Sequence, residues 1–316
     1  MNRCHILPAL AAALLSSALS AAEPDFRSAY ADYSALRLGF PKNEICQTVV
    51  CKPGDGPDIF TASVSHGEVT LQFDSREKLF RKTLSAKTRK FSPDYYAGLA
   101  DGLAMRMGLL GRQGTYASDW LLANDDIFAE MTVRRDDVTV TVTNLRYPFE
   151  AWRSDLRRDK ALRVKLPVFP SGFFVGEITW DRIRKAVRCT GDPESADGAV
   201  CRAPKISKEG VIVRTFVGTD VIKSVSVPID KGSHLLERIR KTNPQLTESG
   251  EGILAVKGDE AKGGVRTETL ADGRIVMTFF TAKPVTDYYE HLQGFKLLQA
   301  EVEKLTGPAK NGSAKQ

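Results

Sequence analysis

The spacing of apolar residues predicts a chain in which short helices alternate with β-hairpins. Phe26, Tyr30 and Tyr33 recur at helical spacing within residues 25–37 and would share one helix face. Residues 138–145 follow the strand pattern instead, because valines alternate with threonines as on a half-buried antiparallel strand. Further helices are expected over residues 92–110, 148–160, 180–187, 233–241 and 287–305.

Turn residues between β-rich runs predict four hairpins. The expected turns are His66-Gly67 and residues 135–137, 218–220 and 271–273. The strands that they join are 59–65 with 68–73, 127–134 with 138–145, 211–217 with 221–228, and 264–270 with 274–282. This pattern predicts an α+β fold of two antiparallel-sheet units, each backed by helices.

Both halves of the chain present these elements in the same order. Each half is expected to contain a helix, a cysteine pair, a hairpin, a helix, a short strand, a hairpin and a helix. The interval is 143 residues from Cys46 to Cys189, 150 from Cys51 to Cys201 and 136 between the second hairpin turns. A degenerate internal duplication explains this order, and a chance similarity between two α+β units is the alternative. Residue identity between the halves is poor, so no residue-level correspondence is predicted.

The N-terminus is typical of a secretory signal peptide. Arg3 supplies the positive charge, residues 6–19 form a short apolar run, and small residues precede Glu23. We expect cleavage after Ala22, with cleavage after Ser20 as the alternative. The apolar run is shorter than a bilayer-spanning helix requires, and no later stretch qualifies. The sequence therefore predicts an exported protein without a transmembrane segment, periplasmic in the first instance and secreted in the second.

The predicted domain organisation follows from these elements. Residues 1–22 form the signal peptide, and residues 23–165 form the first α+β unit. An uncharged segment rich in Pro and Gly, residues 166–176, is expected to be a linker. Residues 177–306 form the second unit, and residues 307–316 are expected to be a disordered tail.

Four cysteines follow the predicted signal peptide, and they predict two local disulfides. An even number of cysteines in an exported chain favours disulfide bridges. We expect Cys46 to pair with Cys51 and Cys189 with Cys201, since each pair is close in sequence and lies among turn residues. A zinc site is disfavoured because no histidine lies near the cysteines. A redox pair is disfavoured because neither spacing is C-x-x-C.

Charge is spread evenly along the chain except in one basic segment. The chain has 45 Lys+Arg and 39 Asp+Glu, and removal of Arg3 with the signal leaves a net charge of +5. Residues 76–90 alone carry +6. The cations of this segment are Arg76, Lys78, Arg81, Lys82, Lys87, Arg89 and Lys90. They predict a positive surface for an anionic envelope component, with a merely solvated face as the alternative.

Motifs that carry catalysis are missing from the sequence. It contains no nucleophile elbow, zinc-protease motif, phosphate-binding loop or dinucleotide fingerprint. The histidines after the signal, His66, His234 and His291, are isolated from one another. The carboxylate pairs at 125–126 and 136–137 are explained by turn formation. No cofactor and no metal are therefore expected.

These observations favour a non-catalytic binding or assembly protein of the bacterial envelope. Its expected partner is an anionic envelope component or another envelope protein, and nucleic acid is disfavoured by export. The alternative is an envelope hydrolase with a scattered active site in a cleft between the units. A histidine within reach of a carboxylate and a serine would favour that enzyme.

Overall fold

The computed structural model describes residues 24–88, 92–114, 116, 118–166, 169, 178–203, 207–229 and 234–306. The predicted signal peptide, the tail and most of the 166–176 linker lie outside these residues. The chain forms two compact units. One comprises the chain up to Ala151 together with residues from Gly294 onward, and the other comprises Trp152 to Gln293. No helix among the described residues is long and apolar enough to cross a membrane.

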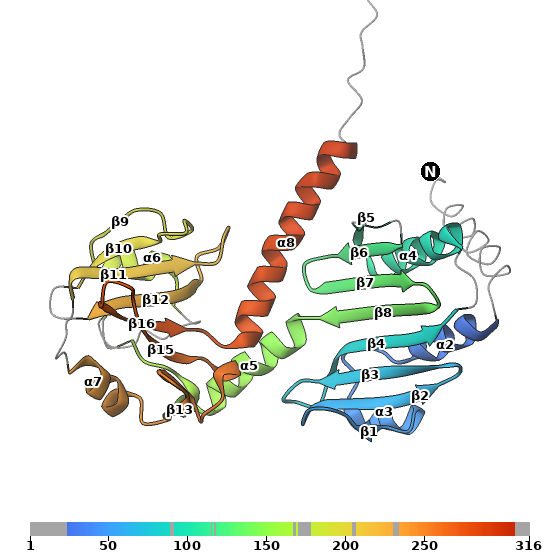
Figure 1. Ribbon diagram of the computed structural model, residues 1–316, viewed down its shortest axis with the longest axis horizontal. Helices are drawn as coiled ribbons and strands as arrows, with labels where there is room; N and C mark the ends of the chain where they lie inside the picture. Colours follow the sequence, from blue (N-terminus) through green and yellow to red (C-terminus); the bar gives the residue numbers. More distant parts are fainter. Residues whose placement is uncertain are drawn as a thin grey trace, which may run out of the picture. The chain divides into compact units, whose positions relative to one another are not determined.

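The first unit is an eight-stranded antiparallel sheet with helices on one face (Figure 1). Its helices are α2 (Pro24–Ala35), α3 (Lys42–Thr48), α4 (Pro93–Met107) and the start of α5 (Arg146–Arg158). Its strands are β1 (Lys52–Pro53), β2 (Ile59–Val64), β3 (Gly67–Phe73), β4 (Leu79–Lys87), β5 (Leu110–Gln113), β6 (Asp119–Ala123), β7 (Ile127–Arg134) and β8 (Asp137–Asn144). Helix α2 packs on β2, β3 and β4, while α4 packs on β5 and β6.

The second unit is also an eight-stranded antiparallel sheet. Its helical segments are η1 (Lys160–Leu162), α6 (Trp180–Ala186), α7 (Leu235–Thr242), η2 (Glu260–Lys262) and the first part of α8 (Lys283–Thr306). Its strands are β9 (Cys189–Thr190), β10 (Ala199–Ala203), β11 (Ser207–Thr215), β12 (Ile222–Ile229), β13 (Leu246–Gly250), β14 (Ile253–Val256), β15 (Gly264–Thr269) and β16 (Ile275–Phe280). The α+β fold with two antiparallel sheets is thus confirmed.

The two sheets have one topology. Each consists of two four-stranded meanders whose last strands pair at the centre of the sheet, β4 with β8 and β12 with β16. The strand order is β1-β2-β3-β4-β8-β7-β6-β5 in the first sheet and β9-β10-β11-β12-β16-β15-β14-β13 in the second. The orders match position for position, which supports the internal duplication.

Backbone pairing shows which residues of the two units correspond. An isolated bridge joins Pro41 to Lys78 in the first unit, and another joins Thr179 to Val221 in the second. The amide of Lys42 donates to the Glu77 carbonyl at 2.8 Å, and the amide of Trp180 donates to the Asp220 carbonyl at 2.7 Å. Both carbonyls lie in the turn before the fourth strand. The residues before α3 and α6 therefore correspond at an interval of 138, and those just before the fourth strands, β4 and β12, at 143.

Both predicted disulfides form, Cys46–Cys51 and Cys189–Cys201, with Cα atoms 5.3 Å and 4.0 Å apart. The cysteines that correspond between the two units are, however, not the ones that the sequence intervals paired, Cys46 with Cys189 and Cys51 with Cys201. The interval of 138 makes Cys51 the counterpart of Cys189. Cys201 lies on β10 at the place that Ala62 occupies on β2. One bridge therefore joins α3 to the residue before β1, and the other joins two neighbouring strands, β9 and β10.

The four predicted hairpins are confirmed, and several other elements were not predicted. The most important of these is β4, which lies at the centre of the first sheet between β3 and β8. Alternation of apolar and polar residues does not reveal β4, because Lys82 occupies a position on its core face. The helix expected from Ser92 begins at Pro93, but Ser92 makes no side-chain capping hydrogen bond, and the helix ends at Gly108 rather than at residue 110.

A cationic cavity in the first unit as a candidate binding site

A cavity of about 370 Å³ opens in the first unit between the end of α2, α4 and the central strands. Fourteen residues line it, and none of them is acidic. The lining residues are Tyr30, Tyr33, Ser34, Leu36, Arg37, Leu38, Lys82, Leu103, Arg106, Met107, Ile127, Val142, Asn144 and Tyr147. Pockets for small ligands typically have this size and this mixture of an apolar wall with a few polar groups.

The backbone at Gly39 brings Tyr147 into the wall of this cavity. Gly39 has a φ of +83°, which favours glycine. A Cβ at this position would collide with the Tyr147 ring. The amide of Gly39 donates to the Leu79 carbonyl at 2.7 Å, which ties the segment after α2 to β4. A side chain at residue 39 would therefore displace either this segment or Tyr147.

Lys82 is the buried one of the three cations that line the cavity, since Arg37 and Arg106 are exposed. It shares the core face of β4 with Leu84 and Ala86, and only 7% of its surface is exposed. Its Nζ donates hydrogen bonds to the carbonyl oxygens of Tyr33 at 2.8 Å and Leu36 at 2.7 Å. These carbonyls lie at the C-terminal end of α2, where carbonyl groups lack helical partners and favour a cation. The end of α2 therefore solvates the buried ammonium group.

The surroundings of Lys82 shift its protonation toward the neutral amine. Burial, together with the positive charge of Arg106, lowers the pKa of Lys82 to about 7. The ammonium group also lies 4.1 Å from the centroid of the Tyr33 ring, at the distance of a cation–π contact. A negative charge in the cavity would act in the opposite direction and favour the protonated form.

Arg106 supplies the second cation of the site. Its Nε donates to the Gly102 carbonyl at 3.2 Å, and its Nη2 donates to the Tyr30 hydroxyl at 3.0 Å. These bonds hold the guanidinium group on α4 beside the aromatic wall. Burial raises the pKa of Tyr30, while the charge of Arg106 opposes that shift. Lys82 and Arg106 together give the site a positive potential that no lining carboxylate neutralises.

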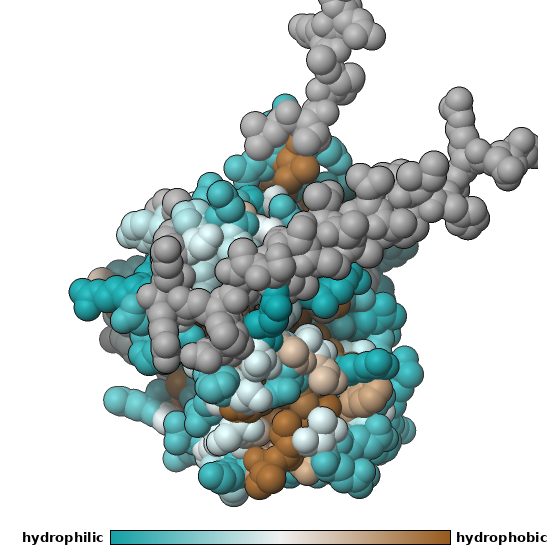
Figure 2. Space-filling view, turned by 90° about the vertical axis from the view of Figure 1, so that its right-hand side faces the viewer, coloured by the Kyte–Doolittle hydropathy of each residue, from teal (hydrophilic) through white to brown (hydrophobic). Residues whose placement is uncertain are grey.

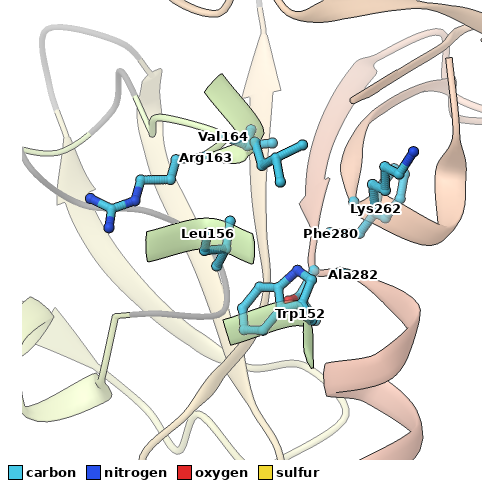
Figure 3. Close-up of a pocket in the computed structure, with 10 residues that line it drawn as sticks. Trp152, Leu156, Arg163, Val164, Lys262, Phe280 and Ala282 are labelled. Carbon is cyan, nitrogen blue, oxygen red and sulfur yellow. The ribbon is translucent and has the colours of Figure 1, made fainter. Parts of the chain in front are cut away.

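The corresponding strand pair of the second unit is apolar and fully buried. Lys82 and Val142 pair across β4 and β8, and their counterparts Val225 and Phe279 pair across β12 and β16. A separate small cavity, at the end of β16 and lined by neither Val225 nor Phe279, encloses about 10 Å³, room for one water molecule at most. Figure 3 shows Trp152, Leu156 and Val164 among the side chains around it. The same topology thus contains an open cationic cavity in one unit and apolar packing in the other.

The predicted basic segment is divided between different environments. Lys82 faces the core, so it does not belong to an exposed surface. Arg81 and Lys87 point to the opposite face of β4 and are exposed, and Lys87 pairs with Asp137 at 2.7 Å. An anionic partner for the exposed cations stays a prediction.

The remaining cations of that segment lie at its two ends. Arg76 and Lys78 lie in the turn before β4, where their amides donate to the carboxylate of Asp74. Arg89 and Lys90 lie outside the described residues. No continuous surface of all seven side chains therefore follows from the described structure.

Three of the residues considered for catalysis, His234, Asp126 and Asp137, form ion pairs or hydrogen bonds with neighbouring side chains. His234 lies at the start of α7 and contacts Glu237 at 3.2 Å, with both side chains exposed. Asp126 pairs with Arg146 at 3.2 Å, and Asp137 pairs with Lys87. Within the described part of the chain, no group of three or more His, Cys, Asp or Glu side chains could hold a metal ion.

Comparison with known proteins identifies no relative. No family model matches the sequence, no curated protein matches it, and no solved structure matches the fold.

Proposed function

We propose that this chain is an exported, non-catalytic binding protein of the bacterial envelope, and that its first unit binds an anionic envelope component in the cavity at Lys82. Two disulfides are typical of proteins in oxidising extracellular or periplasmic compartments. The signal-like N-terminus favours the periplasm, with secretion as the alternative. No cofactor is part of this proposal.

The observation that carries the proposal is the unbalanced charge of the cavity. Lys82 and Arg106 line it, and its described lining includes no Asp or Glu. A buried lysine without a carboxylate partner is rare, because burial of an uncompensated charge is costly. An anionic ligand would supply the missing charge and be held by charge-assisted hydrogen bonds.

The exposed surface offers less support for a large protein interface. The large exposed hydrophobic side chains are spread along the chain, as isolated ones are on ordinary surfaces. Their positions are Phe40, Val50, Met105, Tyr116, Val200, Val217, Leu270 and Leu297. Hydrophilic residues cover much of the described surface in Figure 2, with hydrophobic residues gathered in a smaller area. The cavity is therefore the stronger binding candidate.

The alternative function, an envelope hydrolase, receives no specific support from this cavity. A hydrolytic site needs a base and a nucleophile within hydrogen-bonding reach. Ser34 is the only serine among the described lining residues, and they include neither a histidine nor a carboxylate. Binding is therefore the function that this site supports best.

Titration of the mature chain with a fluorescent anionic probe, anilinonaphthalene sulfonate, tests the proposal. We expect saturable binding that is weakened in Lys82→Met and retained in Arg81→Met, since Arg81 lies on the opposite face of the same strand. A cationic dye of similar size should not bind in this way. Equal probe binding by wild type and Lys82→Met, with both folded by circular dichroism, would reject the cavity as the anionic site.

A further inference from the structure

We propose that the cavity at Lys82 binds a single carboxylate head on an unbranched aliphatic chain, a ligand of the free fatty acid type. This inference rests on the proposed function and narrows the class of ligand. It follows from the few donors at the base of the cavity, from its apolar wall, and from the buried apolar counterpart in the second unit.

The donors at the base of the cavity suit one small anionic head. A protonated lysine has three N–H donors, and Lys82 uses two of them on the carbonyls of Tyr33 and Leu36. One donor thus remains for a ligand. Arg106 uses its Nε and one Nη2 contact within the protein, which leaves part of its planar fork free for a carboxylate. Arg37 is exposed at the rim, where its guanidinium group lies 5.7 Å from the Phe40 ring.

Beyond the tyrosines next to these donors, much of the wall is aliphatic. Six apolar side chains line the cavity and come from the end of α2, from α4 and from the central strands. They are Leu36, Leu38, Leu103, Met107, Ile127 and Val142. A polar glycan would leave its hydroxyl groups unpaired against such a wall, which is unfavourable. An unbranched chain can bury its methylene groups there, and the flexible side chain of Met107 can adapt to it.

The apolar core of the second unit predicts how many ligands each chain binds. Val225 replaces the lysine and pairs with Phe279 in a fully buried apolar core, whereas the cavity at Lys82 encloses about 370 Å³. A carboxylate with a chain of eight to twelve carbons does not fit into this core of the second unit. One ligand per chain is therefore expected, although the fold is duplicated.

Isothermal titration of the mature chain with octanoate, decanoate and dodecanoate tests this inference. We expect one site per chain and an affinity that rises about fourfold for each added CH₂ until the cavity is filled, as burial of about 0.8 kcal/mol per methylene predicts. Decanol and decyltrimethylammonium serve as neutral and cationic controls and should bind at least about tenfold more weakly than decanoate, because they do not pair with the buried cation.

Two variants localise the site. Lys82→Met keeps the length of the side chain and should weaken decanoate binding at least about tenfold, whereas the matched control Arg81→Met should leave it within about twofold. Should Lys82→Met fail to fold, Arg106→Gln provides the second variant, with an expected loss in the same direction.

The possible failures are distinguishable. Binding of decanol as tightly as decanoate, an affinity independent of chain length, or two equal sites per chain would overturn the inference. Lys82-dependent binding of the sulfonate probe without any binding of the carboxylates would overturn it while the proposed function stands. Absence of binding by both the probe and the carboxylates would overturn both.

Discussion

The centres of the two sheets differ in charge at one corresponding position, where the first unit has Lys82 and the second has Val225. Both side chains lie on the core face of the fourth strand of their unit, and both are almost fully buried. Val225 pairs with Val213 and Phe279 in an apolar environment. Lys82 instead reaches the carbonyl groups at the end of α2. A core position thus accommodates a lysine when backbone acceptors and a cavity accompany the charge.

The disulfides show a second difference between the units. Cys51 and Cys189 occupy corresponding positions, but their partners lie in different elements. The partner is in α3 in the first unit and in the adjacent strand β10 in the second. The shared fold therefore does not require one particular bridge. In each unit the cysteine at this position bonds to the partner that the packing of that unit brings near.

Replacement of Val225 in the second unit by the lysine of the first should have the largest effect on stability. Val225→Lys places an ammonium group in an apolar core, and we expect a loss of about 4 kcal/mol or more in the unfolding free energy of that unit. Urea unfolding followed by Trp152 and Trp180 reports on the second unit, and Trp120 reports on the first. A loss below about 1 kcal/mol would show that the second core solvates a lysine as well as the first does.

The stability of the first unit should depend on pH because of Lys82. Its pKa is about 7 in the folded unit against 10.5 in the unfolded chain, so the unfolded chain binds more protons between these values. The unfolding free energy should therefore rise with pH from about 7 to 10, by up to about 1.4 kcal/mol per pH unit. Below pH 7 the full cost of the buried charge is present.

The variant Lys82→Met should remove this pH dependence, and Val225→Met in the second unit should leave it unchanged. Urea unfolding at pH 6, 7, 8, 9 and 10, observed through Trp120, measures the slope in both variants. An identical slope in wild type and Lys82→Met would assign the titration to another group.

Removal of each disulfide should lower the unfolding free energy of its unit by a smaller amount, and the two losses should differ. Loop-closure entropy predicts a loss of about 3 kcal/mol for the Cys189–Cys201 bridge and about 2 kcal/mol for Cys46–Cys51, because the sequence separations are 12 and 5. Each cysteine pair is replaced by alanines, and unfolding is followed through the tryptophans of its unit. This measurement shows which bridge contributes more to the unfolding free energy. A larger loss from the shorter loop would show that native-state packing, not the unfolded chain, dominates.

The smallest effect is expected on the open face of β4. Arg81→Glu combined with Lys87→Glu should change the unfolding free energy by less than about 1 kcal/mol, since both side chains are exposed. Lys82→Glu, one position from Arg81, should destabilise the unit severely.

Co-sedimentation with anionic phospholipid vesicles at low and high salt measures whether the exposed cations also bind an anionic surface. Weaker binding by the double variant at low salt, with the difference lost at high salt, would support the predicted surface. Equal binding at both salt concentrations would leave these cations as a solvated face.

Local patterns in the sequence determined much of this protein. The alternation of valine and threonine in β8, the turn residues of four hairpins and the helical spacing of Phe26, Tyr30 and Tyr33 predicted elements that the structure contains. The cysteine pairs were also predictable, because each pair is close in sequence and short-range closure is strongly favoured. These features depend on interactions between near neighbours, which a sequence displays directly.

The tertiary structure alone decided the site. The sequence places Lys82 in a basic segment, and nothing local separates it from the exposed Arg81 beside it. Only the pairing of β4 with β8 and the approach of α2, 46 to 49 residues away in sequence, turn Lys82 toward two carbonyl groups. The correspondence of Cys51 with Cys189 likewise emerges from strand register. Contacts between distant segments determine burial, and burial determines whether a charge is a surface group or part of a binding site.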